Sequence, residues 1–214
     1  MRRIAFFGGA FDPPHRGHEA AAQQALALKL SDRVLWTPSW RPPHKTVAGM
    51  AGYADRLAMA ALAARAIPGC AASDIEGRKR FDPSYSIRVL AALEEENPGC
   101  RVQLLIGADS LEELHTWYCA KELVERYEII TYPRRLHGKP DAVAPRLPES
   151  FWGAETAGKL RRTVMAGTFV EISSTELRAT LADGGGGGGL VNAAVWEYIK
   201  QHGLYGVKPG PEGE

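Results

Sequence analysis

Short apolar runs alternate along this chain with longer stretches of helix-forming residues, and this alternation limits the fold more than any other feature. Most of the runs end at glycine, proline or a polar turn, as buried strands do. The expected strands are residues 3–7, 33–37, 70–75, 101–106, 127–131 and 168–172. The expected helices are residues 17–30, 53–66, 85–96, 176–183 and 191–202. The pattern predicts an α/β fold, a doubly wound (Rossmann-like) parallel sheet with helices on both faces.

The length of the chain favours one domain. It has 214 residues, of which 45% are hydrophobic, enough to bury a core without a partner. We expect a single domain over residues 1–205, with a closing helical segment at about 174–205. Residues 133–148 are expected to form an irregular linker, and residues 206–214 a flexible tail.

Charge and cysteine content exclude several classes of protein. Lys and Arg number 26 against 25 Asp and Glu, so the net charge is +1 and the basic excess of a nucleic-acid-binding protein is missing. No stretch approaches membrane-spanning length. Cys70, Cys100 and Cys119 form no CxxC pair, which is typical of thiols in a reducing compartment. We expect a cytoplasmic protein without nucleic-acid or membrane partners; a homo-oligomer is compatible with the sequence.

Residues 184–189 are six consecutive glycines. They match the GxGxxG dinucleotide pattern trivially, but they follow an expected helix, whereas that fingerprint needs a strand, a turn and a helix. We interpret the run as a flexible connector of roughly 12–15 Å. No GxxxxGK[ST] sequence occurs, so a P-loop is excluded.

Residues 8–18, GGAFDPPHRGH, join the first expected strand to the first expected helix. Glycines at a strand end let backbone N–H groups approach an anion, and the helix N-terminus adds a favourable dipole. His15 and His18, three residues apart, can face one ligand and donate hydrogen bonds to phosphate oxygens. The alternatives are functionless surface histidines, a zinc site with Asp12 as third ligand, and a merely rigid proline loop.

Residues 172–178, ISSTELR, follow the last expected strand and open a helix. Hydroxyls and N–H groups at such a place can receive a phosphate. Taken alone, the segment also fits an ordinary helix N-cap with Glu176 in the first turn.

Together the two segments resemble the GGxFDPxHxGH and ISxTxxR signatures of the nucleotidyltransferase superfamily. Four further stretches resemble bacterial nicotinate-nucleotide adenylyltransferases: GADS at 107–110 with Thr116-Trp117, PPHK at 42–45, PSYS at 83–86 and VWEYIKQHGLY at 195–205. The resemblance runs from about residue 4 to 205. It implies adenylyl transfer from ATP, accompanied by Mg²⁺, to nicotinate mononucleotide, giving deamido-NAD and pyrophosphate. Another acceptor, such as nicotinamide mononucleotide or phosphopantetheine, and a non-catalytic nucleotide sensor are the alternatives.

The resemblance also implies roles for individual residues. The expected catalytic residues are His15, His18, Lys45 and Arg178. The expected ATP-binding residues are Gly8, Gly9, Ala10, Phe11, His15, His18, Ile172, Ser173, Thr175 and Arg178. The expected acceptor-binding residues are Lys45, Tyr85, Ser86, Asp109 and Trp117, and no metal site made by the protein is expected.

Several of these residues have a plainer alternative role. Trp117 fits an aromatic core residue, Asp109 a helix N-cap before Ser110, Tyr85 a helix-entry contact and Lys45 a solvated loop lysine. The chain departs from the family pattern at Ala10, where a threonine or serine is common, and at the glycine run. We expect Ala10 to weaken phosphate binding without abolishing it, because the backbone N–H remains.

Overall fold

The computed structural model describes residues 1–41, 49–134, 144–167, 170, 172–185, 187 and 189–208. Its centre is a five-stranded sheet in the order β3-β2-β1-β4-β5. The strands are β1 (Arg2–Gly9), β2 (Arg33–Pro38), β3 (Cys70–Ala72), β4 (Cys100–Gly107) and β5 (Glu128–Tyr132). All four pairings are parallel, in agreement with the sequence prediction.

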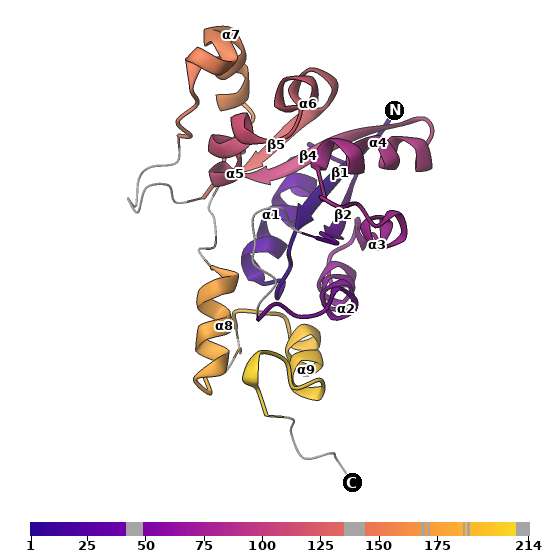
Figure 1. Ribbon diagram of the computed structural model, residues 1–214, viewed down its shortest axis with the longest axis vertical. Helices are drawn as coiled ribbons and strands as arrows, with labels where there is room; N and C mark the ends of the chain where they lie inside the picture. Colours follow the sequence, from indigo (N-terminus) through magenta and orange to yellow (C-terminus); the bar gives the residue numbers. More distant parts are fainter. Residues whose placement is uncertain are drawn as a thin grey trace.

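Helices cover both faces of this sheet (Figure 1). The α-helices are α1 (Arg16–Ala27), α2 (Tyr53–Arg65), α3 (Ile75–Lys79), α4 (Ser86–Glu96), α5 (Ala108–Glu113), α6 (Ala120–Arg126), α7 (Glu149–Arg161), α8 (Ser174–Ala182) and α9 (Ala193–Gln201). Two short 3₁₀ turns are η1 (Leu114–Thr116) and η2 (Leu204–Gly206). In Figure 1, α8 and α9 lie together at one end of the molecule, and α6 and α7 lie at the other.

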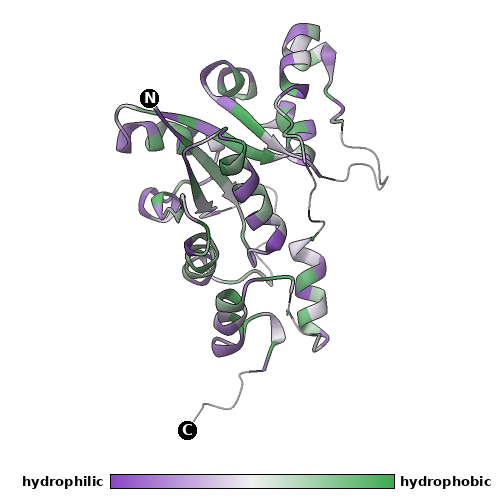
Figure 2. Cartoon of the chain, turned by 180° about the vertical axis from the view of Figure 1, so that it is seen from behind, coloured by the Kyte–Doolittle hydropathy of each residue, from purple (hydrophilic) through white to green (hydrophobic). Residues whose placement is uncertain are grey.

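Strand residues alternate between two hydrophobic cores. Ile4 and Phe6 of β1 pack with α3, α4, α5, α6 and α7, whereas Ala5 and Phe7 pack with α1, α2, α8 and α9. Because successive side chains of a strand point to opposite faces, a sheet buried on both sides reads as a continuous apolar run. Figure 2 shows this as hydrophobic colour over most of the strands and mixed colour on the helices. The doubly wound fold is confirmed.

The strand order places a crevice at a definite point of the sheet. β1 lies between β2 and β4, and the chain reverses its direction of winding between β1 and β4. In open α/β sheets, ligands bind outside the carboxyl ends of the strands at such a switch point. The turn after β1 therefore lies where this fold binds ligands.

Two strand predictions need correction. The strand predicted at 70–75 ends at Ala72, and Ile75 begins α3. Of the strand predicted at 168–172, Val170 and Ile172 lie in no strand, and residues 168, 169 and 171 lie outside the described residues.

Residues 163–165, which follow β5 and precede the predicted strand at 168–172, occupy the edge of the sheet beside β5. The N–H of Thr131 donates to the carbonyl of Thr163, and the N–H of Met165 donates to the carbonyl of Thr131. These two bonds form one isolated parallel bridge, between Thr131 and Val164. The polar groups of Thr131 that a strand at 168–172 would need are thus already used. Apolar content alone did not distinguish the two segments.

Two of the described residues of the glycine run, Gly185 and Gly187, pack closely against the neighbouring helices. The N–H of Gly185 donates to the carbonyl of Thr180 at 2.8 Å. A Cβ at Gly185 would lie 2.7 Å from that carbonyl oxygen, and one at Gly187 would lie 2.8 Å from the ring of Trp196. A side chain at Gly185 or Gly187 would therefore collide with α8 or α9, whereas a Cβ at Gly184 or Gly189 would meet nothing within 4 Å. The flexible connector stays a prediction.

No helix within the described ranges is long and apolar enough to cross a membrane.

Candidate active site

The two histidines of the first motif meet at the N-terminus of α1. His15 is the N-cap residue, and its backbone N–H donates to Nδ1 of His18 at 3.2 Å. The two imidazole rings face each other with centroids 3.7 Å apart. Because Nδ1 accepts a hydrogen bond, a neutral His18 ring carries its proton on Nε2. The arrangement presents an N–H donor beside a helix N-terminus, which is suited to binding an anion.

Aromatic side chains fix the ring of His18. Its centroid lies 5.1 Å from that of Phe11, 5.9 Å from that of Phe7 and 6.2 Å from that of Trp36. Phe11 itself has a φ of +49°, a left-handed conformation that costs energy for a bulky residue. This turn buries the Phe11 ring against Trp36. The expected ATP-binding residue Phe11 therefore supports His18 from the core.

The glycine between the histidines is required by close packing. A Cβ at Gly17 would lie 2.9 Å from the backbone carbonyl oxygen of Val170 and 3.1 Å from the His15 ring. Backbone atoms move little, so a larger residue here would push α1 away from the segment after Met165.

Asp12, which the sequence offered only as a zinc ligand, is a buried structural carboxylate. It is 1% exposed, and its Oδ1 accepts hydrogen bonds from the N–H of Ala51 at 3.0 Å and from the hydroxyl of Tyr205 at 2.7 Å. Its Oδ2 lies 3.4 Å from a terminal nitrogen of Arg178. The carboxylate faces these three donors, and in the described part of the chain no group of three His, Cys, Asp or Glu forms a metal site.

The second motif docks directly on the first. Nη1 of Arg178 donates to the backbone carbonyl of Asp12 at 2.8 Å, and the hydroxyl of Ser174 donates to the carbonyl of Pro13 at 3.2 Å. Nη2 of Arg178 lies 3.5 Å from the hydroxyl oxygen of Thr175, and the arginine side chain keeps 29% exposure. The two motifs, more than 150 residues apart, thus form one site at the N-termini of α1 and α8.

The other members of the second motif lie beside this site. Ser173 is the N-cap residue of α8, as the N-cap alternative predicts, although its side chain makes no capping bond. Ile172 is buried, and its carbonyl faces the guanidinium of Arg134 at 3.4 Å.

Arg56, which sequence reasoning missed, holds the turn after β1 in place through hydrogen bonds from its buried guanidinium. It is 2% exposed, and its guanidinium donates to the carbonyls of Ala51 at 3.1 Å, Ala10 at 2.9 Å and Ser39 at 2.9 Å. Burial lowers the pKa of this guanidinium, and the charge of Asp12 acts in the opposite direction. An arginine inside an alanine-rich helix gave no local signal, because its partners lie on three other segments.

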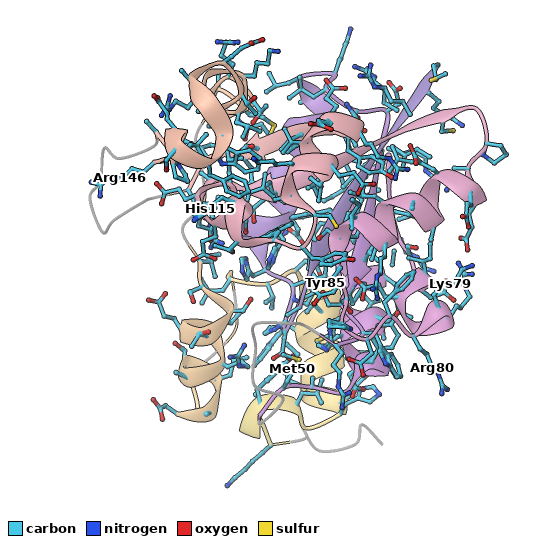
Figure 3. The ribbon with its side chains drawn as sticks, turned by 45° about the horizontal axis from the view of Figure 1, so that its top comes forward. Met50, Lys79, Arg80, Tyr85, His115 and Arg146 are labelled. Atoms are coloured by element: carbon cyan, nitrogen blue, oxygen red, sulfur yellow. The ribbon has the colours of Figure 1, made fainter. Side chains whose placement is uncertain are left out.

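A cavity of about 880 Å³ opens at the carboxyl ends of β1 and β4. Six of the predicted site residues line it: Gly8, Gly9, Ala10, Tyr85, Ser86 and Trp117. His15 and His18 line a smaller cleft with Arg134 and Val170. Tyr132 lines both spaces, so the cavity and the cleft meet at its ring. In Figure 3, Tyr85 faces the middle of the molecule, whereas Lys79 and Arg80 project from its edge.

The acceptor-side aromatic residues form a cluster at the cavity. Tyr85, the N-cap residue of α4, stacks on Tyr118 with ring centroids 4.5 Å apart, and the guanidinium of Arg88 lies over both rings. Trp117 lines the cavity and also packs against the core, so both interpretations of this residue hold. Burial raises the pKa of the Tyr132 hydroxyl to about 12, so it keeps its proton well into alkaline pH.

Asp109 lies at the edge of the site rather than in the cavity lining. Its carboxylate accepts a hydrogen bond from Arg134 at 3.1 Å and is half exposed. The N-cap of α5 is Gly107, and Asp109 lies in the first helical turn, so the N-cap alternative is wrong by two residues.

Glu76 is the second buried charged residue that sequence reasoning missed. It lines the cavity, is 2% exposed and accepts a hydrogen bond from the N–H of Trp40 at 2.8 Å. Desolvation raises the pKa of its carboxyl, against hydrogen bonds from Ser84 and Trp40. The predicted residue Lys45, with the rest of the PPHK stretch, lies outside the described residues.

Comparison with known proteins defines the class of this site. The family model described as cytidylyltransferase-like matches residues 6–180, a span that contains both motifs and four of the five strands in full. The match places the chain among the cytidylyltransferase-like proteins.

Curated relatives define the family within that class. The probable nicotinate-nucleotide adenylyltransferase of Synechococcus sp. (strain JA-3-3Ab) is 40% identical over 209 residues, covering 96% of this chain and 95% of the relative. Its counterpart in Gloeobacter violaceus is 38% identical over 210 residues, covering 97% and 98%. The chain therefore belongs to the nicotinate-nucleotide adenylyltransferase family of enzymes.

Solved structures share the fold. The Plasmodium falciparum nicotinic acid mononucleotide adenylyltransferase complexed with NaAD superposes with a TM-score of 0.72 at 17% identity, covering 98% of this chain and all of that one.

Proposed function

We propose that the protein transfers the adenylyl group of ATP to nicotinate mononucleotide, forming deamido-NAD and pyrophosphate. One observation carries the proposal: the N-terminus of α1, where His15 and His18 line a cleft, lies beside an aromatic-lined cavity of about 880 Å³ at the switch point of the sheet, and Tyr132 lines both spaces. The names of the relatives, at 38–40% identity over almost their whole length, support the same reaction.

In this reaction an oxygen of the acceptor phosphate attacks the α-phosphorus of ATP in line. The bond from that phosphorus to the oxygen bridging to the β-phosphate breaks, and pyrophosphate leaves. No side chain forms a covalent intermediate, so the protein contributes positioning and charge stabilisation. Mg²⁺ is proposed as part of the ATP substrate, because phosphate oxygens are ligands that it prefers.

The first motif is proposed to bind the reacting phosphates. Nε2 of His18 is the ring nitrogen opposite the bond at Nδ1, and its N–H is proposed to donate to an oxygen on the α-phosphate. Backbone N–H groups of the turn at Gly8, Gly9 and Ala10, with the side chain of His15, would add further donors.

The second motif is proposed to bind the leaving pyrophosphate. Arg178 supplies a guanidinium with two donor edges, and Ser173 and Thr175 supply hydroxyls at the α8 N-terminus. The anchoring of Arg178 on the Asp12 carbonyl fixes its distance from the histidines before ATP arrives. Lys45 is proposed as a further cation for the phosphates.

The acceptor is proposed to occupy the large cavity. The flat, cationic pyridinium ring of nicotinate mononucleotide suits stacking on the Trp117 indole, and N–H groups near Tyr85 and Ser86 would receive its carboxylate. Asp109 is proposed to accept a hydrogen bond from a ribose hydroxyl at the edge of the site.

The test is release of pyrophosphate from ATP in the presence of nicotinate mononucleotide, with deamido-NAD identified as product. Omitting either substrate is the control. A protein that binds both nucleotides without releasing pyrophosphate would be the non-catalytic sensor.

A further inference from the structure

Tyr205, near the C-terminal end of the described residues, contacts the loop between β1 and α1. Tyr205 of η2 stands 193 residues after Asp12, and its hydroxyl donates to Oδ1 of that carboxylate at 2.7 Å. The phenol is partly buried against the core made by α1, α2, α8 and α9. Burial and the charge of Asp12 raise the pKa of this phenol, so it remains a donor at every ordinary pH.

The Asp12 carboxylate links Tyr205 to Arg178. Oδ1 is held by two donors from separate elements, the Tyr205 hydroxyl and the Ala51 N–H, so the plane of the carboxylate is fixed. The other oxygen, Oδ2, then lies 3.4 Å from Nη1 of Arg178, the same nitrogen that donates to the Asp12 carbonyl. The position of the guanidinium therefore depends on the orientation of the carboxylate.

The hydrogen bond from Tyr205 also affects charge. A hydrogen-bond donor on Oδ1 stabilises the negative charge of Asp12 inside the protein, so the carboxylate depends less on its ion pair with Arg178. Without this donor only the Ala51 N–H holds Oδ1, so the carboxylate can turn toward the guanidinium and neutralise it more fully.

The backbone around Tyr205 has left-handed conformations at three of four consecutive residues. Tyr205 has a φ of +58°, between Gly203 at +58° and Gly206 at +78°. A bulky residue keeps a left-handed conformation only where its surroundings impose it, and such strain gathers at functional sites. Two bonds also hold the chain just before α9 against α1: the N–H of Arg16 donates to the carbonyl of Leu190 at 2.8 Å, and Asn192 donates to Glu19 at 2.7 Å.

We propose that Tyr205 is a positioning residue for Arg178, acting through the buried carboxylate of Asp12. The inference rests on the phosphate-binding role proposed above for Arg178. It adds that the closing segment of the chain helps to set the affinity for ATP and the rate of adenylyl transfer, without itself touching substrate.

The test compares two tyrosine variants that lose the same kind of bond. Tyr205→Phe removes the donor to Asp12, and Tyr198→Phe removes the donor from α9 to Asp55 of α2, which is 3.0 Å long. Tyr205→Phe should lower kcat/KM for ATP about tenfold, through a lower kcat and a higher KM for ATP, because a small misplacement of a phosphate-binding group is costly. The KM for nicotinate mononucleotide should stay within about twofold, and Tyr198→Phe should keep all three constants.

A double-mutant cycle separates positioning from a general loss of structure. In an Arg178→Lys background, adding Tyr205→Phe should lower kcat/KM for ATP by less than about threefold, because the group it positions has changed. Full additivity, or equal effects of the two tyrosine variants, would overturn the inference. If Arg178→Lys alone leaves ATP use unchanged, the proposed role of Arg178 fails, and this inference fails with it. If Arg178→Lys is strongly impaired while Tyr205→Phe is normal, the inference alone fails.

Discussion

Replacing Arg56 by methionine should remove three hydrogen bonds that hold the turn after β1, the turn proposed to bind phosphate, while keeping most of the side-chain volume. The guanidinium donates to three backbone carbonyls, at 3.1 Å on the segment before α2, 2.9 Å after β1 and 2.9 Å after β2. Hydrogen bonds to a charged group contribute about 1.5–3 kcal/mol each, and the recovered cost of burying the charge offsets part of their sum. We therefore expect the free energy of unfolding to fall by about 3–5 kcal/mol.

Urea unfolding followed by tryptophan fluorescence measures this loss, provided that the slope with denaturant is unchanged. Arg65→Met is the matched control, because Arg65 lies exposed at the last turn of the same helix and should change stability by less than about 0.5 kcal/mol. A loss below about 1 kcal/mol for Arg56→Met would show that these carbonyls find other donors, and would refute this account of the turn.

Three further predictions concern single side chains. His18→Ala should lower kcat far more than it raises KM, and a kcat within about threefold of the wild type would refute its role in the transition state. Burial raises the pKa of the Glu76 carboxyl in the folded protein above the unfolded value near 4.5. The protonated carboxyl therefore contributes fully to folding stability below that unfolded pKa, and the contribution is lost as pH rises through the folded pKa. Urea unfolding across this range should therefore show wild-type stability growing relative to Glu76→Gln as pH falls, and a constant difference would contradict the shift. Burial raises the pKa of the Cys70 thiol to about 11, so a thiol reagent at pH 8 should modify the exposed Cys119 first; mass spectrometry of the peptides would show the reverse order if this is wrong.

Local sequence was sufficient for the elements that are apolar on both faces. The runs that became β1, β2, β4 and β5 are buried between two layers of helices, so their composition alone separated them from the helices. Val170 and Ile172 were wrongly predicted to lie in a strand, because apolar content does not show whether the polar groups of a neighbouring strand are already paired. Helix α7 was not predicted for a different reason: it contains a glycine with non-helical backbone angles at Gly153, which interrupts the helical pattern.

The candidate site was also only partly predictable from local sequence. The sequence could bring His15, His18 and Arg178 together because their motifs lie at helix N-termini, and the structure places the two motifs in contact, while the roles of the three residues stay predictions. Arg56, Glu76 and Tyr205 could not, because each acts through partners that are distant in sequence, 193 residues in the case of Tyr205. Asp12 was visible within the motif, but its donors were not.

The choice of acceptor is the central claim, and the ratio of two kinetic constants tests it most directly. Nicotinate and nicotinamide mononucleotides differ only by a carboxylate against a neutral amide. N–H donors near Tyr85 and Ser86 would bind both carboxylate oxygens, whereas the amide would turn its NH₂ toward one donor and leave both groups unpaired. A buried unpaired polar group costs about 1–3 kcal/mol. We therefore predict that kcat/KM, measured by pyrophosphate release with saturating ATP, favours the acid by roughly tenfold to several hundredfold. Equal values, or a preference for the amide, would contradict the assignment of nicotinate mononucleotide as the acceptor.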